Sequence, residues 1–127
     1  MSKIIAVDFD GTIVSHMYPE IGVDNPNAIR VLKKLIEQGH QLILWTMRSG
    51  PKLDEAVAYC EDQGISFLGV NSNPNQSEWT TSPKQYAHLY IDDAALGCPT
   101  IFDHNTQRQR VNWRDVEAIL IRTGYLI

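Results

Sequence analysis

The chain has 127 residues, of which 43% are hydrophobic and 20% are charged; its formal net charge is −4 and its pI is near 5.4. This length suits one domain with its own core, and the negative charge argues against a protein that grips a nucleic-acid backbone through a basic face. No apolar run approaches the ~20 residues needed to cross a bilayer, and the apolar stretch at the amino end is short and interrupted by Asp8, so we expect a cytoplasmic protein without a signal peptide.

The first part of the chain predicts a strand, a loop and a helix. Residues 4–7, IIAV, form an apolar run that is too short and too evenly apolar for a helix, so we expect a buried strand. Residues 15–25 are polar and irregular, which predicts a loop. A helix is expected to start at Asn25 and Pro26, since proline is tolerated in the first turn, and to end at Gly39. The apolar positions of this helix recur with helical spacing: Ala28, Val31, Leu32, Leu35 and Ile36.

The rest of the chain continues the alternation of strands and helices. Further strands are predicted at residues 42–45, 65–70, 89–91 and 100–102. A second helix opens at Pro51 and ends at Gly64. A loop over residues 71–83 holds many turn formers and precedes a short helical turn at 84–87. Asn112 is expected to cap a last helix.

This alternation predicts one α/β domain over residues 1–127, a three-layer Rossmann-like fold with a mostly parallel central sheet. In such sheets ligands collect outside the carboxyl ends of the strands. Polar side chains follow three of the predicted strands at that edge: Asp8 and Asp10, Thr46 and Arg48, and Asp92 and Asp93. We therefore expect the functional site there.

The acids at this edge predict a magnesium site. Asp8 and Asp10 point to the same side because residues two apart in a strand share a face. Closely spaced carboxylates repel one another, and a divalent cation removes that repulsion. Magnesium prefers oxygen ligands and keeps part of its shell for water or phosphate oxygens. Asp8, Asp92 and the backbone carbonyl of Asp10 form a suitable set.

The neighbouring residues suit a phosphoryl group. Gly11 permits close approach of the backbone, and the exposed amides of Gly11 and Thr12 can cradle phosphate oxygens. Thr46 offers a hydroxyl to the same oxygens, and Lys84 offers a point charge. A metal-held phosphoryl group would then lie beside a carboxylate nucleophile.

These residues, in this order, resemble the motifs of the haloacid dehalogenase superfamily of phosphohydrolases. The matching segments are Asp8-Phe9-Asp10-Gly11-Thr12 after an apolar strand, Thr46 in LILWT, Lys84, and Asp92-Asp93 in LYIDD. The resemblance covers roughly residues 4 to 96.

The resemblance implies a magnesium-dependent phosphatase acting on a phosphate monoester. Asp8 would attack phosphorus to form an aspartyl-phosphate, and Asp10 would protonate the leaving oxygen and then activate the hydrolytic water. Lys84 and magnesium would balance charge in the loose transition state. Asp92 would bind the metal directly, with Asp93 beside it or bound through a water.

The resemblance also predicts that no cap domain covers the site. In this superfamily such inserts follow the first motif or lie between the second and third; residues 13–25 are too few for one, and residues 47–83 are used by a helix, a strand and a loop. An open site suits a phosphorylated macromolecule, or a small substrate enclosed by a neighbouring subunit of a homo-oligomer. The loops at 15–25 and 71–83 would rim it.

Other interpretations of the sequence stay open. Arg48 is either a substrate ligand or a solvated surface group. The chain could instead be a receiver-like phosphoacceptor, which also uses an acid cluster, Thr and Lys on a parallel sheet, although in receivers the phosphorylated acid follows a middle strand. A catalytically silent phosphate-binding protein is the third possibility.

Overall fold

The computed structural model describes residues 2–127, which form three helices, six strands and a short 3₁₀ helix. Their bounds are β1 Ile4–Val7, α1 Ala28–Glu37, β2 Gln41–Leu44, α2 Gly50–Asp62, β3 Gly69–Val70, η1 Gln76–Glu78, β4 Leu89–Ile91, β5 Thr100–Asp103, β6 Arg108–Val111 and α3 Trp113–Arg122. Four strands make a parallel sheet in the order β3-β2-β1-β4, and β5 pairs with β6 in a separate antiparallel hairpin.

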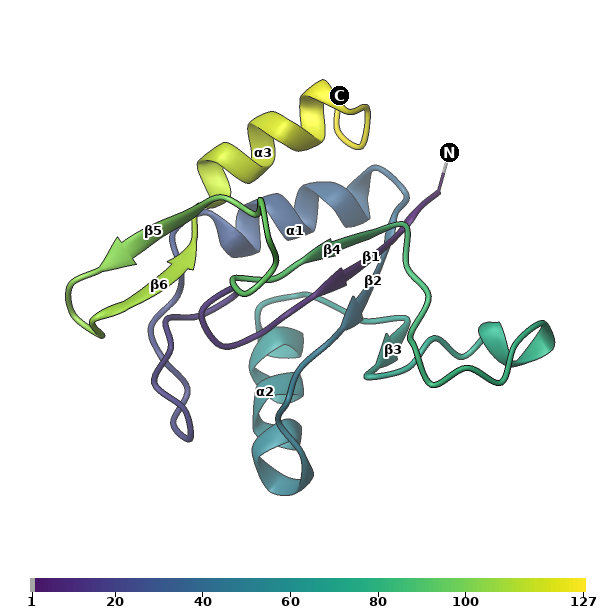
Figure 1. Ribbon diagram of the computed structural model, residues 1–127, viewed down its shortest axis with the longest axis horizontal. Coiled ribbons are helices and arrows are strands. Elements are labelled where there is room, and N and C mark those ends of the chain that lie inside the picture. Colours follow the sequence, from purple (N-terminus) through teal and green to yellow (C-terminus); the bar gives the residue numbers. More distant parts are fainter. Residues whose placement is uncertain (1) are drawn as a thin grey trace.

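The sheet is the middle of three layers. Figure 1 shows α1 and α3 on one face of the sheet and α2 on the other. Residues 5–7 of β1 and 42–44 of β2 are buried. On one face, α1 packs over the sheet with its buried residues Ala28, Val31, Leu32 and Leu35. This confirms the predicted three-layer, Rossmann-like α/β domain, and residues 2–127 contain no separately folded cap. None of the helices in this part of the chain is both long and apolar enough to cross a membrane.

The strand order positions the site. The chain runs from β1 through β2 to β3 on one side and then returns to place β4 on the other side of β1. The crevice at such a reversal lies outside the carboxyl ends of the two strands. Val7 of β1 is paired with Ile91 of β4, so Asp8 and Asp92 are the next residues on neighbouring strands. The backbone N–H of Asp8 continues this pairing by donating to the carbonyl of Ile91 at 3.0 Å.

The hairpin of β5 and β6 differs from the prediction of a fifth strand at residues 100–102. The segment is a strand, but it joins β6 instead of the parallel sheet, with Thr100 opposite Val111. A run of turn-forming residues between the two strands allows the chain to reverse. The N–H of Val111 donates to the carbonyl of Gly11 at 2.8 Å, so the base of the hairpin is joined to the turn that follows β1.

Two predicted boundaries near the helices were wrong for local reasons. The first helix begins at Ala28 and not at Asn25, because Asn27 adopts a left-handed conformation with φ of 70°. The side chain of Asn25 is used elsewhere, as described below. The third strand is Gly69–Val70 only, because the N–H of Ile65 bonds back to α2 through the carbonyl of Cys60.

The segment between β3 and β4 also differs from the prediction. Residues 84–87 form no helical turn; a 3₁₀ helix occurs at Gln76–Glu78 instead. The side chain of Gln76 organises this loop by donating to the carbonyls of Ser82 and Lys84 and by accepting from the N–H of Tyr86 at 2.7 Å. Side-chain to backbone bonds of this kind replace the bonds that a helical turn would make.

Candidate active site

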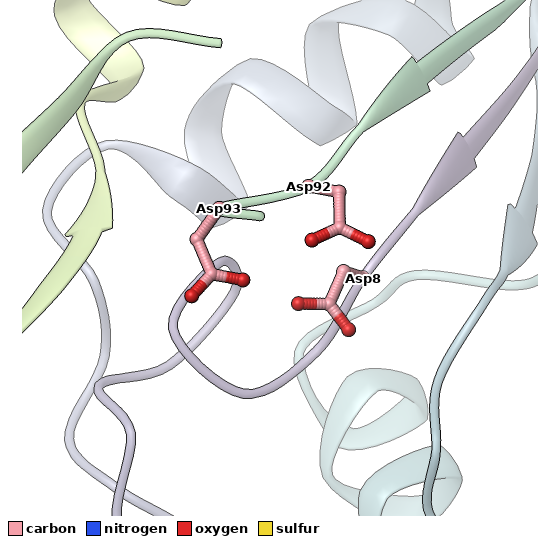
Figure 2. Close-up of side chains that lie close together, drawn as sticks. All are labelled: Asp8, Asp92 and Asp93. Carbon is pink, nitrogen blue, oxygen red and sulfur yellow. The ribbon is translucent and has the colours of Figure 1, made fainter. Parts of the chain in front are cut away.

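Three carboxylates converge at the crevice between β1 and β4. Asp8 follows β1, and Asp92 and Asp93 follow β4; Figure 2 shows their side chains gathered around one point. One oxygen from each residue lies within 4.8 Å of the others. Hard oxygen atoms this close together suit a divalent cation such as magnesium or calcium.

The electrostatics of the cluster are costly without a cation. Burial, followed by the negative charge of Asp92, raises the pKa of Asp8 from 3.8 to about 8. Burial also raises the pKa of Asp93, while its hydrogen bond with Asp8 opposes that rise. These carboxylates are partly removed from water and lie close to like charge, so the fold disfavours their ionised forms. A bound cation would reverse that preference.

Thr12 and Gly11 hold the cluster together from behind. The Thr12 side chain is fully buried; its hydroxyl donates to a carboxylate oxygen of Asp8 at 3.0 Å and accepts from the N–H of Asp93 at 3.3 Å. Gly11 has a φ of +79°, and a Cβ there would lie 2.6 Å from a carboxylate oxygen of Asp93. Neither residue lines the cavity at the acids. The N–H groups of Gly11 and Thr12, which we expected to bind phosphate oxygens, donate to the carbonyls of Val14 and Phe9 at 2.8 and 3.1 Å. In this structure both residues position the acids.

Asp10 is paired with Arg48 and is not part of the three-acid cluster. The Nε and one terminal nitrogen of Arg48 donate to the two carboxylate oxygens of Asp10, each at 2.8 Å. The guanidinium also donates to the carbonyls of Pro19, Glu20 and Lys52. An arginine has five N–H donors, so all of them are used.

The environment of Arg48 fixes it as a structural link. Its side chain is 0% exposed, and its guanidinium lies over the rings of Phe9 and Tyr18 at 5.1 and 5.0 Å. Through these contacts it joins the loop at residues 15–25 to Asp10. Neither sequence interpretation of Arg48 matches this arrangement, because the side chain is buried and has no donor left for a substrate.

Thr46 is positioned by the strand β2 and by a residue from the next crossover. The backbone N–H of Thr46 donates to the side-chain oxygen of Asn71 at 2.8 Å, and its hydroxyl accepts from the N–H of Arg48. Asn71 has a left-handed φ of 54°, which asparagine tolerates better than most residues. In the sequence Asn71 is one of several turn formers, so its contact with Thr46 was not evident.

The acids, Thr46 and Arg48 all line one cavity of about 480 Å³. Its lining residues are Asp8, Asp10, His16, Tyr18, Thr46, Met47, Arg48, Asp92, Asp93, Ala94 and Arg108. The structure thus brings together all three strand ends that the sequence placed at one edge. The loop at 15–25 contributes His16 and Tyr18, in agreement with its expected place at the rim, whereas the loop at 71–83 lines a different depression.

Lys84 does not reach this cavity, contrary to our expectation. It is exposed in the segment that enters the amino end of β4, whereas Asp92 follows the carboxyl end of the same strand. Arg108 of the hairpin lines the cavity instead and was not predicted from the sequence. The turn-rich stretch between residues 103 and 108 was the signal that a second strand returns there.

A comparison with solved structures finds a protein similar to this chain. Neither protein-family models nor curated proteins match the chain. A solved structure described as a conserved protein coded by a locus from Bacteroides thetaiotaomicron is similar, with a TM-score of 0.80 and 36% sequence identity over 97% of this chain and 93% of that chain. That description gives no activity. The chain belongs to the same family as this conserved Bacteroides thetaiotaomicron protein.

Proposed function

We propose that this protein is a magnesium-dependent phosphatase that hydrolyses a phosphate monoester through an aspartyl-phosphate on Asp8. The observation that carries the proposal is the cluster of Asp8, Asp92 and Asp93 at the reversal of strand order, inside a cavity that is open to substrate. The resemblance of the sequence to the haloacid dehalogenase superfamily supports the same assignment.

The cluster fits a hard cation by its chemistry. All donors are carboxylate oxygens, and Asp8 and Asp93 have raised pKa values that a cation would lower again. Asp8, Asp92 and Asp93 would hold the ion, together with the backbone carbonyl of Asp10. When bound, magnesium neutralises charge on the phosphoryl oxygens and orients the group for attack.

Residues of the chain supply the nucleophile, a ligand for the phosphoryl group and the acid–base group. Asp8 supplies the nucleophilic carboxylate, and Thr12 orients it through the hydrogen bond at 3.0 Å. Thr46 offers its hydroxyl to a phosphoryl oxygen. Asp10 serves as the proton donor to the leaving oxygen and then as the base for water, and Arg48 holds its carboxylate in place.

Release of inorganic phosphate from an aryl phosphate tests this function. The metal-free protein should be inactive, magnesium should restore repeated turnover, and Asp92→Asn should lose most of it. Asp54→Asn is the matched control, because Asp54 is an exposed acid on α2 that does not line the cavity. Full turnover in chelator, with metal analysis showing an empty protein, would refute the proposal. Phosphate release that stops near one per chain would favour a receiver-like phosphoacceptor.

A further inference from the structure

Negative charge accumulates in the proposed reaction. Three carboxylates and an incoming phosphoryl dianion carry more negative charge than one divalent cation can balance. Phosphoryl transfer therefore needs at least one further positive group near the transferred oxygens. The sequence assigned this role to Lys84, which the structure places outside the cavity.

Two permanently charged cations line the cavity within the described residues, Arg48 and Arg108. Arg48 is committed to Asp10 and to three backbone carbonyls, as shown above. His16 also lines the cavity, but a histidine side chain does not carry a permanent charge. Arg108 is the cation that has donors to spare.

The surroundings of Arg108 keep its side chain available. It is exposed, and in the part of the chain from residue 2 onward its side chain forms no ion pair. Asp103 lies opposite Arg108 in the hairpin register, but its carboxylate accepts from the N–H of Asn105 at 3.0 Å, within the turn.

The strand that carries Arg108 is held firmly against the site. Three residues farther on, Val111 donates its N–H to Gly11 and accepts at its carbonyl from the buried side chain of Asn25 at 2.9 Å. Trp113 adds a bond from its ring nitrogen to the carbonyl of Thr12 at 2.7 Å. The base of the hairpin is therefore joined to the turn that positions Asp8 by three hydrogen bonds.

We propose that Arg108 is the catalytic cation that binds the phosphoryl group, in place of Lys84. This inference rests on the proposed function, because it assigns a further residue to the same site. A guanidinium on the hairpin suits the role, since arginine presents paired donors that match phosphate oxygens.

Binding of inorganic phosphate by calorimetry, in the presence of magnesium, provides a test that does not depend on turnover. Arg108→Gln should weaken phosphate binding by ~10- to 100-fold, and Arg108→Lys should recover part of the loss because it keeps the charge. Lys84→Gln is the matched control and should bind phosphate as the unaltered protein does. Unchanged melting curves would show that the exposed substitutions leave the fold intact.

Steady-state kinetics on an aryl phosphate complete the experiment. Arg108→Gln should lower kcat as well as raise KM, because the cation acts on the charge of the transition state. Loss of phosphate binding and kcat in Lys84→Gln, with Arg108→Gln unaffected, would overturn the inference while leaving the phosphatase intact. An unaltered protein that binds phosphate but releases none from any ester would overturn the proposed function, and with it the catalytic part of this inference.

Discussion

A single glycine permits the acid cluster to form. Gly11 combines a φ of +79° with a carboxylate oxygen of Asp93 only 2.6 Å from where a Cβ would lie. The sequence predicted that glycine here allows a close approach, but the approaching group is Asp93 and not the substrate. Side-chain contacts between segments eighty residues apart cannot be derived from the pattern around Gly11.

Gly11→Ala should weaken magnesium binding by about 10- to 100-fold, as do other changes to residues that orient metal ligands. Gly97→Ala is the control, because Gly97 has a similar φ of +88° but nothing within 4 Å of its added Cβ. Both variants should share the strain of a left-handed alanine, seen as a lower melting temperature. Titration calorimetry measures the difference, and equal magnesium affinities in the two variants would contradict this account of Gly11.

The charge of Asp8 should make stability depend on pH in the metal-free protein. Its pKa is 3.8 in an ordinary environment and about 8 in the fold, so the folded state favours the protonated form. The resulting stabilisation is fully present below about pH 4 and is lost as the pH rises through about 8. Magnesium competes with this proton, so its stabilising effect should grow over the same range.

Melting curves between pH 5 and pH 9, with chelator and with magnesium, measure both effects. Asp8→Asn should flatten the fall in melting temperature, because asparagine carries no titrating proton. A fall of the same size in Asp8→Asn would assign the pH dependence to other groups.

Local patterns describe β1, β4 and the start of α3 well. β1 and β4 have the predicted bounds, and Asn112 caps α3 by accepting from the N–H of Asp115. Short apolar runs and helical spacing are enough to predict such elements, because burial of one face dominates their stability. The hairpin was missed because β6, RQRV, has polar residues at three of its four positions, two of them exposed, and so resembles a loop.

Asn25 holds this hairpin to the turn after β1 and should be the most sensitive contact between them. Its buried amide donates to the carbonyls of Thr12 and Val111, at 2.8 and 2.9 Å. Asn25→Ala removes both of these buried bonds and leaves the carbonyl of Thr12 with only its bond from the ring nitrogen of Trp113. This loss should lower the free energy of unfolding by about 1–3 kcal/mol. The displacement of the hairpin should also weaken phosphate binding through Arg108.

Urea unfolding of Asn25→Ala, followed by phosphate titration at a temperature where it is folded, measures these two losses. Asn75→Ala is the control, since Asn75 is exposed in the loop after β3 and its side chain makes no bond among the described residues. A change in Asn25→Ala no larger than that in Asn75→Ala would mean that the hairpin does not depend on this link.

At the scale of the whole molecule, the place of the site followed from the sequence more reliably than the roles of its residues. The rule that ligands gather at the carboxyl ends of parallel strands predicts that Asp8, Thr46 and Asp92 lie at one edge. Roles depend on which donors remain free after folding. Arg48 and Lys84 show this, since one is buried among acceptors and the other lies outside the cavity.

Because the site is open, we expect the residues at the rim of the cavity to determine which substrates bind. No cap covers the site within residues 2–127, and exposed side chains such as Tyr18 and Met47, the latter 98% exposed, line the cavity. We propose that the substrate is a phosphorylated macromolecule, or a small ester that a neighbouring subunit encloses.

Capture of the phosphoenzyme tests the central claim most directly. The protein and two variants are mixed with an aryl phosphate and magnesium and quenched rapidly in acid. Mass spectrometry of the intact protein then detects a phosphoryl adduct. Asp10→Asn keeps an oxygen to accept from Arg48 but has no acid–base group, so it should form the adduct and hydrolyse it ~10²–10⁴-fold more slowly. Asp8→Asn should show no adduct and essentially no turnover. A phosphoryl adduct on Asp8→Asn, or Asp10→Asn turning over alkyl and aryl phosphates at the native rate, would contradict the account.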